Sequence, residues 1–350
     1  MGSVVPLFLL GYYGFGNWGD ELSLLATLCA LEDVAGELGC SFTYHVLSGK
    51  RGMPFPLPPR CHLVPRYAEG KILRALWEST FLVVGGGSLL QDVTSFRSLV
   101  YYAAFLAVAK GMRKKRIFFG CGLGPFRRAV SERIVRYLLR GSEIFLARDE
   151  ETLRFLKHHG LCPVSLVADP VFLLWRGEEA SPTSRFAIFL RKQALAHKGT
   201  LLVALRELQR RGVDLECVAF HRDEDWEVAL LFGEELGVPA RYFQSFEEVW
   251  TYFQTLGGVL SMRFHPLVLA TCFGIPWCAL HLDPKISSFS AHWRGRNLFA
   301  PSEITPDVVS SFLEQSSALR EETLRLRGLF VGRARSGREE LARAFRRVLG

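Results

Sequence analysis

The chain has 350 residues, of which 49% are hydrophobic and 22% charged, and this length exceeds the usual size of one hydrophobic core, so two domains are expected. The formal charge of +8 suits an anionic small substrate or an anionic membrane surface, whereas the lack of a basic block interleaved with aromatic residues argues against nucleic acid. Eight cysteines without a C-x-x-C pair, and no apolar run of about 18 residues, favour a cytoplasmic protein with reduced thiols and no zinc site.

The first half of the chain alternates short apolar runs with helical patterns, which is typical of parallel, doubly wound sheets. Strands are predicted near residues 4–10, 43–47, 80–84, 116–120, 143–147 and 164–167. Helices are predicted near residues 20–38, 95–112, 128–140 and 150–159. We therefore expect an N-terminal α/β domain over residues 1–170.

The second half repeats this alternation after an interval that loses periodicity. The interval, 171–185, is rich in Pro, Ser and Gly and is predicted to be the domain linker. Strands are predicted near residues 186–190, 215–220, 240–243, 257–262 and 276–280. A C-terminal α/β domain over 186–320 is expected, followed by an Arg-rich helical segment, 321–350, that packs back on the first domain.

Two α/β domains joined by a linker are expected to face each other across a cleft. Ligands of open α/β sheets bind beyond the carboxyl ends of the strands. Functional residues were therefore sought directly after each predicted strand.

The stretch GYYGFGNWGDE (11–21) follows the first predicted strand and opens the first predicted helix. Gly14 and the other glycines permit positive φ and close backbone approach, so N–H groups at a helix N-terminus can hold an anion or a polar ligand. The dinucleotide-binding spacing G-x-G-x-x-G occurs once, from Gly14 to Gly19, but too early and with bulky aromatic residues between its glycines, and no Gly-Lys-Ser/Thr follows as in a P-loop. Asn17 and Asp20 are candidate ligand contacts. The alternative is a structural turn in which Asp20 caps the helix.

The stretch VVGGGSLLQD (83–92) repeats this arrangement after another predicted strand. Gly86 and Gly87 would let the backbone approach a substrate, Ser88 could bind it, and Asp92 lies about one turn further on. A tight turn between a strand and a helix is the alternative interpretation.

Charged residues follow three other predicted strands. Arg148 is placed to hold a carboxylate or phosphate in bidentate fashion, although a surface contact with Asp149 or Glu150 would also explain it. Arg263 and His265 stand at the head of an apolar helix, where Arg263 could bind an anion and His265 could transfer a proton. A packed or capping histidine is the alternative.

Lys285, in LDPKISSF, is a third cation after a strand, and a solvated loop lysine is its alternative. Three cations, a histidine and several glycine loops suit a small, doubly anionic substrate better than a neutral sugar. These candidate residues include no D-x-D motif, H-x-x-x-H pair or cysteine cluster that would indicate a metal, and no cofactor is expected.

The blocks GYYGFGNWGDE, VVGGGSLLQDVTSFRSLVYY, GCGLGPF, ARDEETLRFLKHHGL, ADPVF, SMRFHPLVLATCFGIP and LDPKISSF resemble, in order and spacing, those of the polysaccharide pyruvyl transferases. The match runs from about residue 8 to 290 and is closest to the CsaB type of bacterial cell-wall polymer pyruvylation and S-layer anchoring. Phe264 departs from the more usual Leu, and His281 stands where another aromatic or polar residue is common. Neither change removes a group that the reaction needs.

The resemblance implies a glycosyltransferase-B-like fold of two Rossmann-like domains, with the acceptor on the N-terminal and the donor on the C-terminal side. The donor would be phosphoenolpyruvate and the product a pyruvate ketal on a sugar, with release of phosphate. For this type the acceptor resembles a lipid-linked disaccharide containing N-acetylmannosamine. Arg148, His265 and Lys285 match the family's essential basic residues, and Arg263 matches its second donor-binding arginine.

The chemistry of the residues agrees with that implication. Arg148 and Arg263 would bind the carboxylate and phosphate of the donor, and Lys285 would bind phosphate or act as a general acid. His265 is the best candidate for general acid–base catalysis, and Asp20 is a candidate base or acceptor ligand.

Two other functions remain open from the residues alone. One is a nucleotide-sugar-dependent glycosyltransferase of the same fold, which would need an acidic residue late in the second domain for the ribose hydroxyls of its donor. The other is a non-catalytic glycan- or anion-binding protein, which the presence of both His265 and Lys285 disfavours. The Arg-rich C-terminal helix is most simply a solvated face, and docking on the anionic inner surface of the plasma membrane is its alternative.

Overall fold

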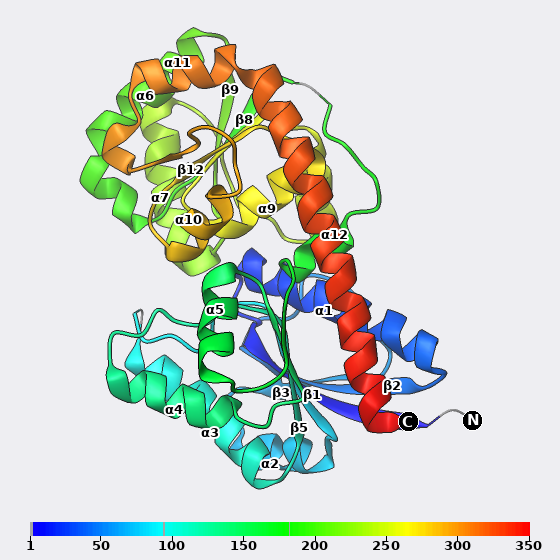
Figure 1. Cartoon of the computed structure of the whole chain (residues 1–350). Coiled ribbons are helices and arrows are strands. Elements are labelled where there is room, and N and C mark those ends of the chain that lie inside the picture. Colours follow the sequence, from blue (N-terminus) through cyan, green and yellow to red (C-terminus); the bar gives the residue numbers. More distant parts are fainter. Residues whose placement is uncertain (1–2, 94, 182) are drawn as a thin grey trace. The chain divides into compact units, whose positions relative to one another are not determined.

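A computed structural model of the chain describes residues 3–93, 95–181 and 183–350. The chain forms two compact units (Figure 1). Unit 1 comprises the residues up to Phe15, Asp20–Leu174 and Phe330–Gly350, and unit 2 comprises Gly16–Gly19 and Trp175–Leu329. Each unit contains one sheet in which every pairing of neighbouring strands is parallel, as the alternation of elements predicted.

Unit 1 is built on a seven-stranded sheet in the order β3-β2-β1-β4-β5-β6-β7. Its strands are β1 (Val4–Tyr13), β2 (Ser41–Ser48), β3 (Cys61–Pro65), β4 (Phe81–Gly85), β5 (Lys115–Cys121), β6 (Ile144–Ala147) and β7 (Val164–Leu166). Its helices are α1 (Trp18–Leu38), α2 (Glu69–Glu78), α3 (Phe96–Gly111), α4 (Ala129–Leu139), α5 (Glu150–His159) and the 3₁₀ helix η1 (Pro170–Leu174). The order reverses between β1 and β4, which is the Rossmann switch point.

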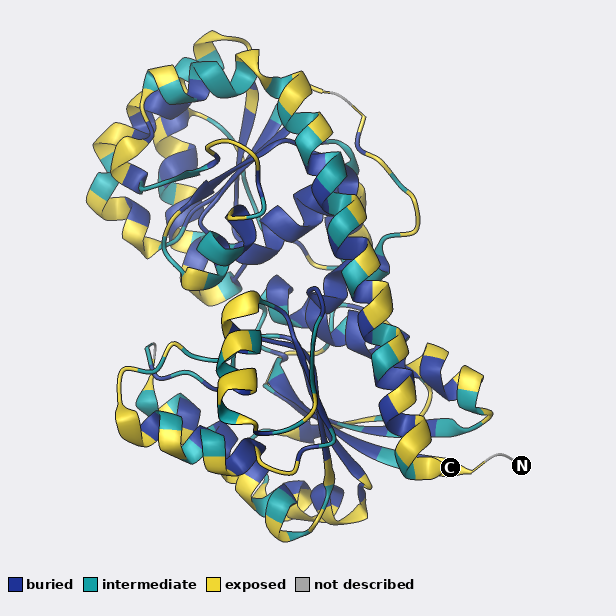
Figure 2. Cartoon of the chain, in the orientation of Figure 1, coloured by how far each residue is buried: buried dark blue, intermediate teal, exposed yellow. Residues whose placement is uncertain are grey.

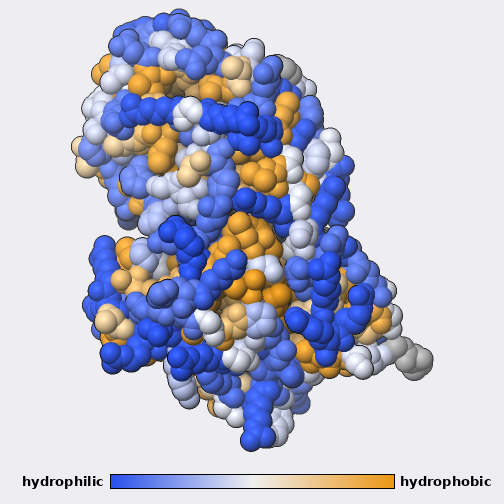
Figure 3. Space-filling view, viewed as in Figure 1, coloured by the Kyte–Doolittle hydropathy of each residue, from blue (hydrophilic) through white to orange (hydrophobic). Residues whose placement is uncertain are grey.

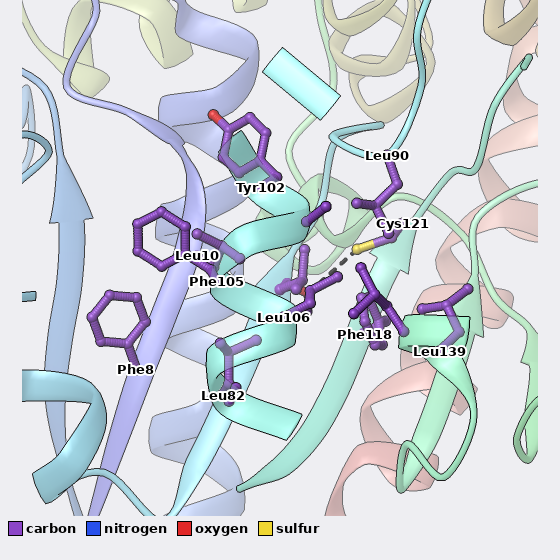
Figure 4. Packing of buried hydrophobic residues seen from close by; sticks show 14 of the residues in the cluster. Phe8, Leu10, Leu82, Leu90, Tyr102, Phe105, Leu106, Phe118, Cys121 and Leu139 are labelled. Carbon is purple, nitrogen blue, oxygen red and sulfur yellow. Dashed lines mark hydrogen bonds between the residues drawn. The ribbon is translucent and has the colours of Figure 1, made fainter. Parts of the chain in front are cut away.

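The strands of unit 1 are continuously apolar because helices cover both faces of a parallel sheet. Every residue of β4 and β6 is buried, and most strand residues in Figure 2 are dark blue. Phe8, Leu82, Leu106 and Phe118 belong to an apolar cluster that packs on this sheet (Figure 4). This core fixes the loops that follow β1, β4 and β6.

Unit 2 has a six-stranded sheet in the order β10-β9-β8-β11-β12-β13. Its strands are β8 (Arg185–Phe189), β9 (Asp214–Val218), β10 (Ala240–Arg241), β11 (Gly258–Ser261), β12 (Trp277–Leu280) and β13 (Leu298–Phe299). Its helices are η2 (Lys192–His197), α6 (Lys198–Arg210), α7 (Arg222–Leu236), α8 (Phe246–Gln254), α9 (Phe264–Phe273), α10 (Pro284–Ser290), η3 (Pro301–Glu303) and α11 (Pro306–Glu314). The switch point here lies between β8 and β11.

The unit boundaries differ from the predicted domains in three places. The segment predicted as linker, 171–185, begins inside η1, and the units divide after Leu174. The segment Gly16–Gly19 belongs to unit 2 although the elements on either side belong to unit 1. It is bonded there by Arg222 N–H to Gly16 O and by Trp18 N–H to Phe220 O, each at 2.9 Å.

The third difference is α12 (Ser316–Leu349), one uninterrupted helix that begins before the predicted C-terminal segment. Its residues from Phe330 onward belong to unit 1, where Phe345 packs on Phe42 and Phe81 with ring centroids 5.0 and 4.6 Å away. Hydrophilic side chains cover the outer side of its C-terminal part (Figure 3). Among the helices of the described residues, none has the length and apolar character that crossing a membrane requires.

Candidate functional site

In the glycine-rich loop after β1, two backbone N–H groups already donate hydrogen bonds within the protein. Gly14 has a φ of +74°, and a Cβ there would meet Ser48 and the backbone of Gly49 and Arg51. The N–H groups of Gly14 and Phe15 both donate to Oε1 of Glu21, at 2.9 and 3.2 Å. The conformation is the one expected for an anion cradle, but a carboxylate of the chain itself occupies these two donors.

The two polar residues predicted as ligand contacts in this loop, Asn17 and Asp20, differ in what they contact. Asn17 Oδ1 accepts from Gly19 N–H at 3.3 Å, so the N-cap is Asn17 and not Asp20. Asp20 instead points towards the triple-glycine loop, because a Cβ built on Gly87 would lie 3.6 Å from its Oδ1. Asp20 therefore remains a candidate ligand contact in unit 1.

The triple-glycine loop after β4 is shaped by close packing. Gly86 and Gly87 have φ values of +70° and +73°. A Cβ on Gly86 would approach Ser23 Cβ to 2.7 Å, so no larger residue fits against α1. Gly87 is more open, and its carbonyl accepts from Gly122 N–H at 2.9 Å. Of the two glycines, only Gly87 has room for an approaching ligand.

Arg148 lies directly after β6 and is buried. Its Nη1 pairs with Asp169 Oδ2 at 3.1 Å, and its Nη2 donates to Ser88 Oγ at 3.0 Å. The alternative predicted for this arginine was a surface contact with Asp149 or Glu150, but Asp149 caps α5 by accepting from Thr152 N–H. Burial lowers the pKa of Arg148, but its acidic neighbours, chiefly Asp169, together raise it by more. The net pKa lies above its ordinary value, so the guanidinium stays charged.

Asp92, predicted as a substrate contact, holds the backbone before α4. It is buried and accepts from Arg127 N–H at 2.6 Å, Arg128 N–H at 3.1 Å and Ser131 Oγ at 2.7 Å. Burial raises the pKa of this carboxyl, but these hydrogen bonds lower it more, and the net pKa lies below its ordinary value. These contacts explain Asp92 without a substrate.

Unit 2 brings its predicted residues together at the carboxyl edge of its sheet. Arg263 precedes α9 and is held by two carboxylates of α7. Its Nε and Nη2 bond Asp225 at 2.9 and 2.6 Å, and Nη2 also bonds Glu224 at 2.7 Å. Since Asp225 is almost fully buried, most of the charge of Arg263 is neutralised within the protein.

His265 is the second residue of α9 and is only 9% exposed. Its ring meets the Phe264 ring edge-on, with centroids 5.1 Å apart. Its Nδ1 lies against Gly19, so closely that a Cβ at that position would overlap the imidazole. The third glycine of G-x-G-x-x-G is thus needed to seat this histidine, a role that the spacing did not reveal.

Lys285 lies in the first turn of α10, which Asp283 caps through Lys285 N–H at 3.1 Å. Its ammonium is a third exposed and lies 3.3 Å from Asp283 Oδ2. The same ammonium is 6.0 Å from the centroid of the Phe264 ring. Phe264 therefore contacts both predicted catalytic groups of unit 2.

Sequence reasoning missed a further cation, Arg191, two residues after β8. Burial and the neighbouring Arg263 lower its pKa, and Glu224, at 3.8 Å, compensates only in part. The charge of Asp283, which caps the helix that carries Lys285, raises the pKa of Arg191 in turn. Because β8 and β11 flank the switch point, Arg191 occupies the expected ligand position. It directly follows the predicted strand 186–190, but no motif in the sequence marks it.

The edge of unit 2 can therefore hold a small anion. Arg191 and Lys285 carry partly exposed positive charge, and His265 supplies an imidazole whose ring nitrogens can donate and accept hydrogen bonds. Within the described ranges, no group of three or more His, Cys, Asp or Glu side chains could hold a metal ion.

Comparisons with known proteins agree with this geometry. A family model described as polysaccharide pyruvyl transferase matches residues 44–284. A search of curated protein sequences gives no match.

Three solved structures with a similar fold contain a bound nucleotide or nucleotide sugar. UDP-GlcNAc 2-epimerase from Neisseria meningitidis, bound to UDP-GlcNAc, has a TM-score of 0.63 at 10% identity, covering 99% of this chain and 100% of that one. Anabaena Alr3699/HepE with UDP-glucose has a TM-score of 0.61 at 12% identity, covering 97% and 99%. A ugt transferase from Siraitia grosvenorii with UDP has a TM-score of 0.57 at 12% identity, also covering 97% and 99%. These similarities confirm the glycosyltransferase-B-like fold and, at such identities, nothing more.

Proposed function

Because the chain belongs to the polysaccharide pyruvyl transferase family, we propose that it moves the enolpyruvyl group of phosphoenolpyruvate to a sugar of a cell-surface polysaccharide precursor. The observation that carries the proposal is the grouping of Arg191, His265 and Lys285 beyond the switch point of unit 2. Two partly exposed cations beside a histidine suit a donor with two anionic groups.

Unit 2 is proposed to bind the donor. Phosphoenolpyruvate carries a carboxylate and a phosphate, and Arg191 and Lys285 are assigned to them because their charges are the least compensated. Arg263 adds positive charge at the same edge, but Asp225 and Glu224 already bond it. We assign Arg263 a supporting role, in which it fixes the turn that presents His265.

Ketal formation requires protons to move in both directions. One sugar hydroxyl adds to the central carbon of the enolpyruvyl group as the methylene carbon takes a proton, and a second hydroxyl then displaces phosphate from that carbon. Both hydroxyls lose their protons, and the departing phosphate needs positive charge. His265 is proposed as the acid–base group, and Lys285 as the group that stabilises phosphate.

Unit 1 is proposed to bind the acceptor through Asp20 and Gly87, which face each other after β1 and β4. The resemblance to the CsaB type supports a lipid-linked acceptor containing N-acetylmannosamine, so the reaction would take place at the inner membrane surface.

Arg346 and Arg347 near the end of α12 are exposed and could contact anionic lipid. Sedimentation with phosphatidylglycerol vesicles tests this contact, and no binding at low salt would rule it out.

Replacing Arg191 with Met should weaken phosphoenolpyruvate binding about 10- to 100-fold, the usual effect of losing a charge-assisted hydrogen bond. Binding to the folded state raises Tm, so a thermal shift titration measures it. The matched control is Arg210→Met in the same unit, since Arg210 is 70% exposed and pairs only with Glu207 in the described structure. We expect the control to bind as the wild type does.

The same titration separates the proposed function from its alternatives. Stabilisation by a UDP-sugar but not by phosphoenolpyruvate would indicate a glycosyltransferase. Stabilisation by a glycan alone would indicate a binding protein. Equal phosphoenolpyruvate affinity in Arg191→Met and wild type would contradict the donor assignment.

A further inference from the structure

Four aromatic rings surround the guanidinium of Arg66 in unit 1. Its central carbon lies 5.7 Å from the centroid of Tyr12, 5.2 Å from Phe15, 4.1 Å from Tyr101 and 5.2 Å from Tyr102. Tyr12 and Phe15 stack on each other, with centroids 4.3 Å apart and planes 10° apart. We call these five residues and the adjacent Tyr67 the aromatic cluster.

The aromatic cluster lies at the carboxyl edge of the unit 1 sheet. Tyr12 is near the end of β1, Arg66 directly follows β3, and Tyr101 and Tyr102 lie on α3. In Figure 4 Tyr102 stands beyond Leu10, at the end of the core opposite Leu82. This is the edge at which open α/β sheets bind ligands.

Part of the aromatic cluster has a structural purpose. Arg66 Nη1 donates to Tyr102 Oη at 3.0 Å, and Tyr101 Oη donates to Arg66 O at 3.0 Å, which ties the end of β3 to α3. This tether does not require the stacked pair, whose rings are only half-buried. It does not require Tyr67 either, which is 75% exposed. One exposed and two half-buried rings beside a cation at a ligand-binding edge indicate a recognition surface.

We propose that the aromatic cluster binds a sugar ring of the glycan acceptor. One face of a hexose presents C–H groups of partial positive charge, and these fit the negative face of an aromatic ring. Its hydroxyl groups would find donors in the guanidinium of Arg66 and partners in the tyrosine hydroxyls. The proposal rests on the proposed function, since it gives the acceptor a place in unit 1.

Asp20 links the aromatic cluster to the chemistry. Burial raises the pKa of Tyr102, Arg66 lowers it, and the negative charge of Asp20 raises it again, so Asp20 acts directly on this residue. Its carboxylate also faces Gly87. The negative charge of Asp20 therefore acts on the side of unit 1 where the stacked sugar would lie.

Saturation-transfer NMR on the full chain tests the proposal without any pyruvyl transfer. The probes are the methyl glycosides of N-acetylmannosamine, N-acetylglucosamine, galactose and glucose, with no phosphoenolpyruvate present. At least one probe should bind, and Tyr67→Ala and Phe15→Leu should each weaken it about tenfold, as expected for a lost stacking contact. The matched control is Tyr137→Ala on α4, since Tyr137 is 63% exposed in the same unit.

The outcomes distinguish sugar binding by the aromatic cluster from the proposed pyruvyl transfer. Binding that is weakened by the two variants and kept in the control supports the aromatic cluster even if no phosphate is ever released. No probe bound by the wild type, or equal binding in all variants, overturns the aromatic cluster. Pyruvyl transfer with an unchanged acceptor KM in Tyr67→Ala and Phe15→Leu would also overturn it while leaving the proposed function standing.

Discussion

Gly19→Ala should lower pyruvyl transfer at least a hundredfold in a protein that still folds. A methyl group at this position would overlap Nδ1 of His265, which has little room to move because it is buried at the head of α9. The imidazole would have to turn away, and general acid–base catalysis is typically worth 10²- to 10⁴-fold. Phosphate release from phosphoenolpyruvate measures the loss, and urea unfolding measures the stability.

The control lies in the same helix. A Cβ on Gly36 of α1 would meet no atom within 4 Å, so Gly36→Ala should keep full activity and gain up to about 1 kcal/mol from helix propensity. Overpacking at Gly19 should cost about 1–3 kcal/mol. Wild-type activity in Gly19→Ala would show that the position of His265 against Gly19 does not matter for the reaction.

Arg148→Met should destabilise unit 1 by about 3–5 kcal/mol, because it leaves the carboxylate of Asp169 buried without its partner. The double variant Arg148→Met/Asp169→Leu removes both charges and should recover most of that loss. Denaturant unfolding of the single and double variants measures the coupling. The surface control is Arg136→Met, whose partner Glu132 is on the same helix and whose pair is worth at most about 1 kcal/mol.

Comparing the single and double variants also decides between two roles for Arg148. The resemblance implies that Arg148 binds the donor, whereas its contacts with Asp169 and Ser88 indicate that it positions the triple-glycine loop. Loss of phosphoenolpyruvate affinity in Arg148→Met, with less than 1 kcal/mol of destabilisation, would contradict the positioning role. A double variant that recovers stability and donor binding together would support it.

The sheets could be read from the sequence because their strands are buried on both faces. Runs such as those of β4 and β6 are continuously apolar and lie between helical patterns, so both the parallel sheets and the fold class were predicted correctly. Strand β3 and helix α2 were missed. β3 is a short edge strand with exposed residues after a Pro-rich stretch, so it lacks the apolar run that marks an inner strand.

The candidate site was harder to read, because a sequence shows which groups follow a strand but not which groups they bond. Arg148 and Arg263 were expected to have open charges, yet Asp169 and Asp225 pair with them from distant parts of the chain. Asn17 also has a local structural partner. Arg191 was overlooked although it follows β8, since no motif marks it. Strand order identifies it, because it places β8 next to β11.

The central claim is tested most directly by the release of inorganic phosphate from phosphoenolpyruvate by the full-length chain. The acceptors are N-acetylmannosamine, galactose, glucose and a lipid-linked disaccharide containing N-acetylmannosamine, and His265→Ala is the control. We expect phosphate release that depends on an acceptor and disappears in the control. No release with any acceptor, together with no thermal stabilisation by phosphoenolpyruvate, would contradict the account.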